Sequence, residues 1–105
     1  MSWALLVLAG LFEIGFASTL KLTDGFTKRW PTLIFTVCSV LSFLLLNKTL
    51  KDIPIGTAYA VWTGIGAAGT AIVGILVYKE PSTALRLFFI ATLIGSIIGL
   101  KLATK

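Results

Sequence analysis

Four long runs of apolar residues, separated by short polar segments, dominate the pattern of this chain. A helix that crosses a bilayer needs about 20 mostly apolar residues, and each run reaches or approaches that length. The pattern predicts membrane-spanning helices at residues 2–20, 31–46, 55–78 and 84–100. The runs do not alternate between apolar and polar positions, which argues against the strands of a membrane barrel. We therefore expect an all-α integral membrane protein with residues 1–105 as a single domain.

Composition supports a membrane protein and excludes several kinds of chemistry. Hydrophobic residues make up 57% of the chain and charged residues 12%, whereas about 25% of a soluble domain is charged. There is no histidine, and the one cysteine, Cys38, lies in an apolar run. Histidine-based triads and most zinc sites are therefore excluded, and one chain cannot form a disulfide. We expect no metal, no cofactor and no enzymatic nucleophile–base pair.

The formal net charge of +5 comes from short basic clusters between the apolar runs. Such clusters suit helix ends at the lipid headgroups better than a nucleic-acid surface, so we expect no nucleic-acid partner. The termini and the middle connection share one side of the membrane, with Lys48, Lys51, Lys101 and Lys105; the other side carries Lys21, Lys28, Arg29, Lys79 and Arg86. Four basic residues on one side and five on the other give no bias in orientation. The sequence therefore predicts that the chain inserts into the membrane in both senses. The alternative is a weak bias that one or two residues decide.

Glu13 is the one acidic residue inside a predicted span, near the middle of the first. A charged acid at that depth costs about 2.5 to 3.5 kcal/mol or more, and intramembrane acids usually mark functional sites. The alternative is a structural acid that locks helices together. Gly10 and Phe16 lie about one helical turn away on either side, so we expect both to line a site around Glu13.

The second and third spans carry groups that suit a cation near a carboxylate. Hydroxyl side chains in the second span form one stripe, at Thr32, Thr36, Ser39 and Ser42, and they can bond a carboxylate or its proton. In the third span Tyr59 and Trp62 can enclose a cation between ring faces, with Thr63 on the same side. The alternatives are ordinary hydroxyl bonds between helices and aromatic residues of the membrane interface.

Small residues mark packing faces in the last two spans. Residues 64–69 match the spacing of a dinucleotide-binding loop, but no strand precedes them, so we interpret these glycines as allowing a bend or close packing. In the fourth span Gly95 and Gly99 are four residues apart, and Ala91 lies one step earlier. This spacing is typical of helix association and often of dimer contacts. We expect the fourth helix to join two chains.

A dimer would bring two Glu13 carboxylates together. If the two chains insert in opposite senses, they form the inverted repeat of alternating-access transporters, with a site near the midplane. A cation and protons would compete for the paired acids, which predicts an exchanger. A proton channel could also use one buried acid, but it would not need the Tyr59/Trp62 pair. A passive assembly factor would not need Glu13.

The chain also resembles the small multidrug resistance transporters over essentially its whole length. The matching segments are Trp3, residues 9–13 (AGLFE), 25–27 (GFT), Pro31, 42–43 (SF), 54–66 (PIGTAYAVWTGIG), 79–81 (KEP) and 98–101 (IGLK). The resemblance implies an antiparallel dimer in the bacterial inner membrane that exchanges protons for small cations. It also implies that Glu13 binds both, and that Ser42, Tyr59 and Trp62 line the binding site.

Within that family the third and fourth helices look most like the guanidinium exporters. Those exporters usually carry a tryptophan one turn after the acid, where this chain has Phe16. The change removes an indole N–H donor and puts strict guanidinium selectivity in doubt. The alternatives are a broader exporter of quaternary ammonium and aromatic cations, and one subunit of a paired heterodimeric transporter.

Overall fold

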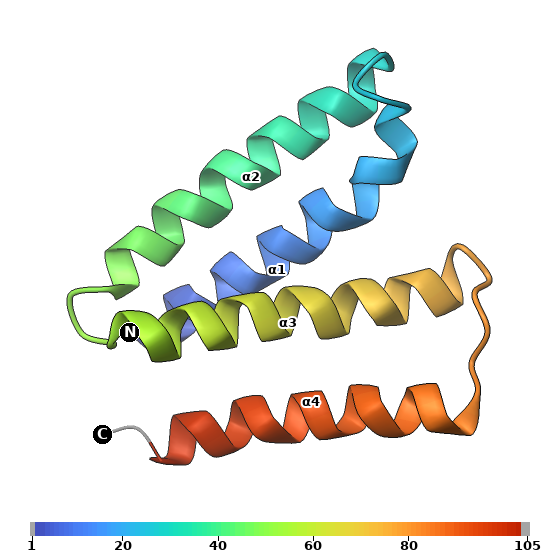
Figure 1. The fold of residues 1–105 in the computed structure, drawn as a ribbon. Coiled ribbons are helices and arrows are strands. Elements are labelled where there is room, and N and C mark those ends of the chain that lie inside the picture. The colour runs from blue at the N-terminus through green and yellow to red at the C-terminus, as the bar shows by residue number, and fades with distance from the viewer. Residues whose placement is uncertain (1, 104–105) are drawn as a thin grey trace.

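The computed structural model describes residues 2–103, and Lys105 of the predicted charge balance lies outside them. Four α-helices follow one another: α1 (Ser2–Leu20), α2 (Arg29–Thr49), α3 (Ile55–Leu76) and α4 (Ala84–Ala103), with a short 3-10 turn, η1 (Lys21–Thr23), after α1. All four are long and apolar enough to cross a membrane, and residues 2–103 contain no strand. The prediction of an all-α protein with four membrane-spanning helices is confirmed (Figure 1).

The helix ends differ from the predicted bounds where polar residues flank the apolar runs. Helix α2 begins at Arg29, before the predicted residue 31, because Pro31 fits within a first helical turn. The helix ends at Thr49, beyond the predicted residue 46. Helix α3 stops at Leu76, before the predicted residue 78. There Lys79 adopts a left-handed φ of 59°, and the Glu80 N–H returns to the Gly74 carbonyl at 3.0 Å. This return satisfies a carbonyl at the helix end and closes α3.

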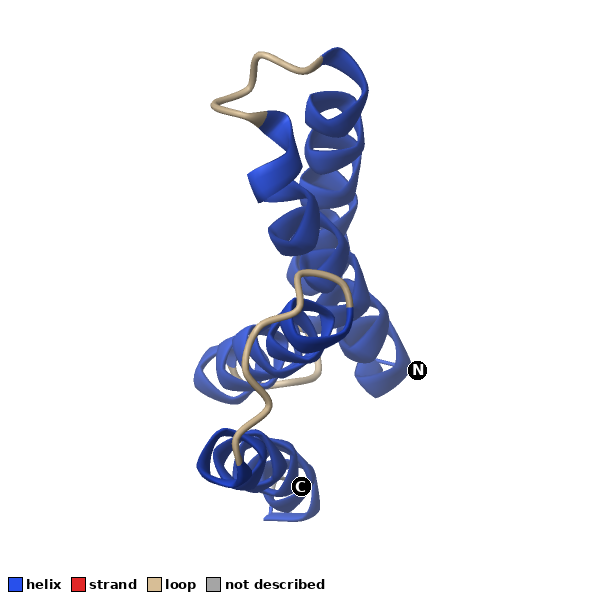
Figure 2. Cartoon of the chain, turned by 90° about the vertical axis from the view of Figure 1, so that its right-hand side faces the viewer, coloured by secondary structure: helices blue, strands red, loops and turns tan. Residues whose placement is uncertain are grey.

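The helices form a thin layer and not a closed bundle. The Cα trace measures 42 × 35 × 17 Å, and a helix with its side chains is about 10–12 Å across. Helix α1 lies between α2 and α3, and α4 lies at the edge beside α3 (Figures 1 and 2). The α2–α3 connection shares one end of the molecule with both termini, and the other two connections lie at the opposite end (Figure 1).

The core is small and lies between α1 and α3. Its buried apolar residues are Leu6, Ala9, Ile53, Ala58, Val61 and Trp62. Helix α4 contributes no buried residue, and large apolar side chains are exposed on all four helices. In water this surface would drive aggregation, whereas in a membrane lipid or another helix covers it.

Candidate functional site

Glu13 projects from α1 onto the backbone of α3. Its carboxyl group lies against Gly66, where a Cβ atom would overlap it. The Oε1 atom is buried and has no hydrogen-bond partner within residues 2–103. The one ion pair in the same residues, Glu80–Arg86, involves other groups. Glu13 is therefore an acid inside a spanning helix without a compensating partner among residues 2–103.

Glycines on both helices allow this close approach. Gly66 and Gly69 of α3 receive Glu13 and Ile14 of α1, and Gly10 of α1 receives the Ile65 side chain. A Cβ at any of the three glycines would overlap the side chain that it faces. The glycine-rich stretch at 64–69 thus serves close helix packing. Gly10, which we expected to line the site, is buried against α3, one turn from Glu13.

A chain of two hydrogen bonds ties three helices together beside Glu13. The Trp62 Nε1–H donates to Ser42 Oγ at 2.8 Å, and the Ser42 hydroxyl donates to the Ala9 carbonyl at 2.7 Å. Ala9 precedes Glu13 by four residues, so its carbonyl also accepts the helical N–H of Glu13. The Ser42 and Trp62 polar groups therefore reach the backbone of the helix that carries Glu13.

Six aromatic rings form one continuous file across α1, α2, α3 and the α1–α2 connection, which carries Phe26. Ring centroids are 5.5 Å apart for Tyr59–Trp62, 5.3 Å for Trp62–Phe43 and 6.2 Å for Phe43–Phe16. The file continues from Phe16 to Phe35 at 5.6 Å and from Phe35 to Phe26 at 5.3 Å. The sequence alone assigns no role to Phe26, Phe35 or Phe43, because an apolar ring in or beside a spanning helix carries no signal of its own.

The remaining predicted site residues make no hydrogen bond to the Glu13 carboxyl group in the described residues. The Ser39 hydroxyl donates to the Phe35 carbonyl of its own helix at 2.6 Å. Thr63 is exposed, and Tyr59 is 59% exposed. Phe16 is half-buried within the aromatic file. The single chain thus brings Ser42 and Trp62 to the helix of Glu13 and leaves Tyr59 and Thr63 uncovered.

The small-residue face of α4 points away from its own chain. A Cβ at Gly95 or Gly99 would meet nothing within 4 Å, and Ala91 is exposed. Helix α4 instead packs on α3 through Ile97, which fills the notch at Gly64. Between α1, α3 and α4 lies an apolar cavity of about 250 Å³, lined by Ile14, Ile65, Ala68, Gly69, Ile72, Ile94, Ile97 and Ile98. It carries no group that would hold a cation.

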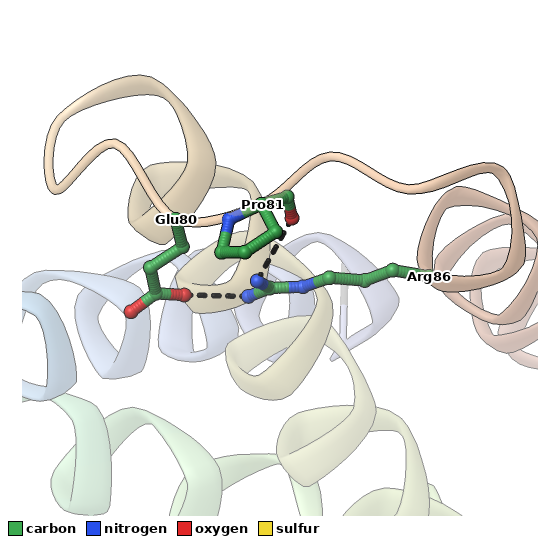
Figure 3. Close-up of polar contacts among 3 residues, drawn as sticks. All are labelled: Glu80, Pro81 and Arg86. Atoms are coloured by element: carbon green, nitrogen blue, oxygen red, sulfur yellow. Dashed lines mark hydrogen bonds and ion pairs between the residues drawn. The ribbon is translucent and has the colours of Figure 1, made fainter.

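The α3–α4 connection is fixed by a basic residue of α4. Figure 3 shows the Arg86 guanidinium bonded to the Glu80 carboxylate at 2.5 Å and to the Pro81 carbonyl at 3.1 Å. The Glu80 carboxylate also lies over Gly74, where a Cβ would overlap it. These contacts use the charge of Arg86 within the connection and hold the turn between the two helices.

The sequence of this chain is similar to the sequences of known proteins over most of its length. The model of the family described as Small Multidrug Resistance protein matches residues 1–93. The guanidinium exporter of Proteus vulgaris is 49% identical over 104 residues, which cover 99% of this chain and 100% of the relative. The guanidinium exporter of Escherichia coli (strain K12) is 48% identical, with 99% of each protein covered. With its four apolar helices and these bacterial relatives, the chain is a multi-pass protein of the bacterial inner membrane.

Proposed function

The chain belongs to the small multidrug resistance family, and we propose that it is a proton-coupled antiporter that exports small guanidinium-type cations. Similarity to guanidinium exporters over nearly the full length supports the class of substrate. The observation that carries the mechanism is Glu13, an acid inside a spanning helix with no partner in the part of the chain that the structure describes. A transporter also accords with the family better than an enzyme does.

Glu13 couples the two fluxes because its carboxyl group holds either a proton or a cation. A carboxylate in a medium of low dielectric needs a positive partner, so loss of one ligand favours binding of the other. We assign substrate and proton binding to Glu13, Ser42, Tyr59 and Trp62. Gly10, Phe16, Ser39 and Thr63 complete the lining. The Trp62–Ser42–Ala9 chain supports this assignment, because it fixes the α2 and α3 groups relative to the helix of Glu13.

The transporting unit is an antiparallel homodimer joined through Ala91, Gly95 and Gly99. The open space at both glycines supports this contact, and so does a layer only 17 Å thick, which cannot enclose a cation. The balanced charges of the connections favour insertion in both senses. Two lysines added after Lys105 should bias insertion and lower transport, and an oppositely biased copy should restore it. If the unmodified chain labels from one side of the membrane alone, a paired heterodimer replaces the homodimer.

Proteoliposomes test the proposed exchange directly. Guanidinium and a quaternary ammonium ion are each presented against a pH gradient, and proton movement is followed in the lumen. We expect guanidinium to drive proton movement in the native protein and none in Glu13→Gln. Glu13→Asp is the matched control: it keeps a carboxylate and should retain transport with a shifted pH profile. Cation-driven proton movement in folded Glu13→Gln, or proton flux without any added cation, would overturn the proposal.

A second candidate substrate class is quaternary ammonium and aromatic cations, and Phe16 is the observation that favours it. The Phe16 ring packs between Phe35 and Phe43 and offers a ring face but no N–H donor. A cation without N–H groups can bind through charge and ring faces alone. The same vesicle experiment distinguishes the two classes through the ratio of their transport rates.

A further inference from the structure

The α1–α2 connection exposes aromatic rings and basic side chains together. Phe26 is 55% exposed and Trp30 is 69% exposed, and Lys28 and Arg29 between them are also exposed. We call these four residues the aromatic–basic patch. Its residues lie between the end of η1 and the first turn of α2, at the ends of two spanning helices, where a membrane changes from hydrocarbon to headgroups.

The local backbone holds Phe26 in this exposed position. Asp24, Gly25 and Phe26 have positive φ values of 48°, 71° and 69° in succession. Buried Thr23 stabilises the turn: its hydroxyl accepts the Phe26 N–H at 3.3 Å, and its carbonyl accepts the N–H groups of Thr27 and Lys28. The Phe26 ring also packs on Phe35 at 5.3 Å. The ring is therefore placed by the fold and is not simply the end of a free loop.

The charges of the patch are not neutralised within the described chain. Lys28 and Arg29 make no ion pair in residues 2–103. Lys21 lies with its ammonium 4.9 Å from the centre of the Tyr78 ring. Asp24 is the one acid of residues 21–30, so three positive charges less one negative leave +2. An anion at the patch would therefore meet a net positive field.

The α2–α3 connection has basic residues but lacks the other features. It carries Lys48 and Lys51, yet its apolar residue Ile53 is turned inward and is 2% exposed. Its acid, Asp52, accepts a hydrogen bond from the Ser2 hydroxyl at 2.5 Å. At the same end the Lys101 ammonium lies 5.4 Å from the centre of the Trp3 ring, which is half-buried. Basic groups are therefore common to both ends of the molecule, whereas the α1–α2 end places the exposed rings of Phe26 and Trp30 beside them.

We propose that the aromatic–basic patch is a docking site for the headgroup of an anionic phospholipid. Lys28 and Arg29 bind the phosphate, which they match in charge and donor geometry. Phe26 and Trp30 enter the boundary between headgroups and acyl chains, where amphipathic rings are most stable. This site is separate from Glu13 and does not depend on transport.

Native mass spectrometry of the full chain tests the site with phosphatidylglycerol and phosphatidylcholine as probes. The double variant Lys28→Gln/Arg29→Gln should lose affinity for phosphatidylglycerol on the order of tenfold, because two basic groups near the headgroup are removed. Lys48→Gln/Lys51→Gln removes the same charge from the opposite end and should keep native binding. Phe26→Ser should weaken binding with all charges retained, and circular dichroism checks that each variant is folded.

Three results would overturn the proposal. Equal losses in the two double variants would mean that net charge and not the patch binds the lipid. Equal binding of phosphatidylcholine would mean an unselective lipid belt. Displacement of phosphatidylglycerol by millimolar inorganic phosphate would mean a site for a free ion. None of these readouts uses transport, so each stands apart from the test of antiport.

Discussion

Helices α3 and α4 are both glycine-containing apolar spans, yet they are used in opposite ways. Helix α3 has seven buried residues, and side chains of α1, α4 and the following connection fill the notches at Gly64, Gly66, Gly69 and Gly74. Helix α4 has no buried residue in the described chain, and the space beside Gly95 and Gly99 is open. Both helices are apolar enough to cross a membrane. Apolar character therefore does not predict burial here, because lipid solvates an apolar helix as well as a protein core does.

The difference teaches what a glycine signifies in each helix. In α3 the missing side chain makes room for groups of the same chain, above all for Glu13. In α4 the missing side chain makes room for something that the chain does not supply. Substitutions in α3 should therefore act on the site of one chain, and substitutions in α4 should act on the joining of two.

The largest effect is expected at Gly66. Gly66→Ala places a methyl group where the Glu13 carboxyl group lies, so the carboxyl group must move. A displacement of about 1 Å at a reacting group can reduce a rate on the order of 100-fold, and we expect a loss of that size in guanidinium-driven proton movement. Cross-linking in liposomes should show native dimer content. Transport within a few-fold of native would mean that the carboxyl group does not use this notch.

Substitutions at Gly95 and Gly99 should weaken dimer formation and leave the fold of the single chain unchanged. Gly95→Leu/Gly99→Leu should leave the helical content unchanged, because the side chains enter open space within the chain. Dimer formation should weaken by about 1 to 3 kcal/mol, the usual range for overpacking a close contact. Fluorescence energy transfer between labelled chains in vesicles measures the strength of dimer formation. Ser96→Leu, also exposed on α4, is the control. Native association in the double variant would place the dimer contact elsewhere.

Selectivity between cations should change with substitutions in α1 or α3 and not with substitutions in α4. Phe16→Trp adds an indole N–H near Glu13 and should raise the ratio of guanidinium to tetramethylammonium transport. One hydrogen bond contributes on the order of 1 kcal/mol, or about fivefold in that ratio. Phe88→Trp makes the same substitution at an exposed ring of α4 and should leave the ratio unchanged. An unchanged ratio in Phe16→Trp would assign specificity to Ser42 or to the Tyr59/Trp62 pair.

The smallest effect concerns Ile97, through which α4 fills the notch at Gly64 of α3. Ile97→Val removes one methylene from a half-buried contact and should lower resistance to unfolding by about 0.5 kcal/mol. Titration with a denaturing detergent, followed by circular dichroism, measures this change. Ile94→Val at an exposed position is the control. A larger loss from Ile94→Val would mean that α4 packs on α3 through a different face.

The sequence was sufficient for the features that depend on one helix at a time. Four spans follow from the lengths of the apolar runs, and the singular position of Glu13 follows from composition. The glycines of residues 64–69 predict either a bend or close packing, and the structure shows close packing. The contacts between helices could not be predicted, because they depend on how each helix is rotated about its axis. The bond from Ser42 to the Ala9 carbonyl and the aromatic file are of this kind. The roles assigned to the site residues stay predictions.

A layer 17 Å thick with only a small core leaves most of both faces open, and this shape has a genetic consequence. If two chains must meet to enclose a cation, the number of working units rises with the square of chain density while single chains are in excess. Halving gene dosage would then reduce export by more than half. At a density where most chains are paired, an inactive copy such as Glu13→Gln, expressed beside the native gene, would draw native chains into mixed pairs and act as a dominant-negative allele. Resistance of a cell to the exported cation would thus fall in proportion to the fraction of native chains lost to such pairs.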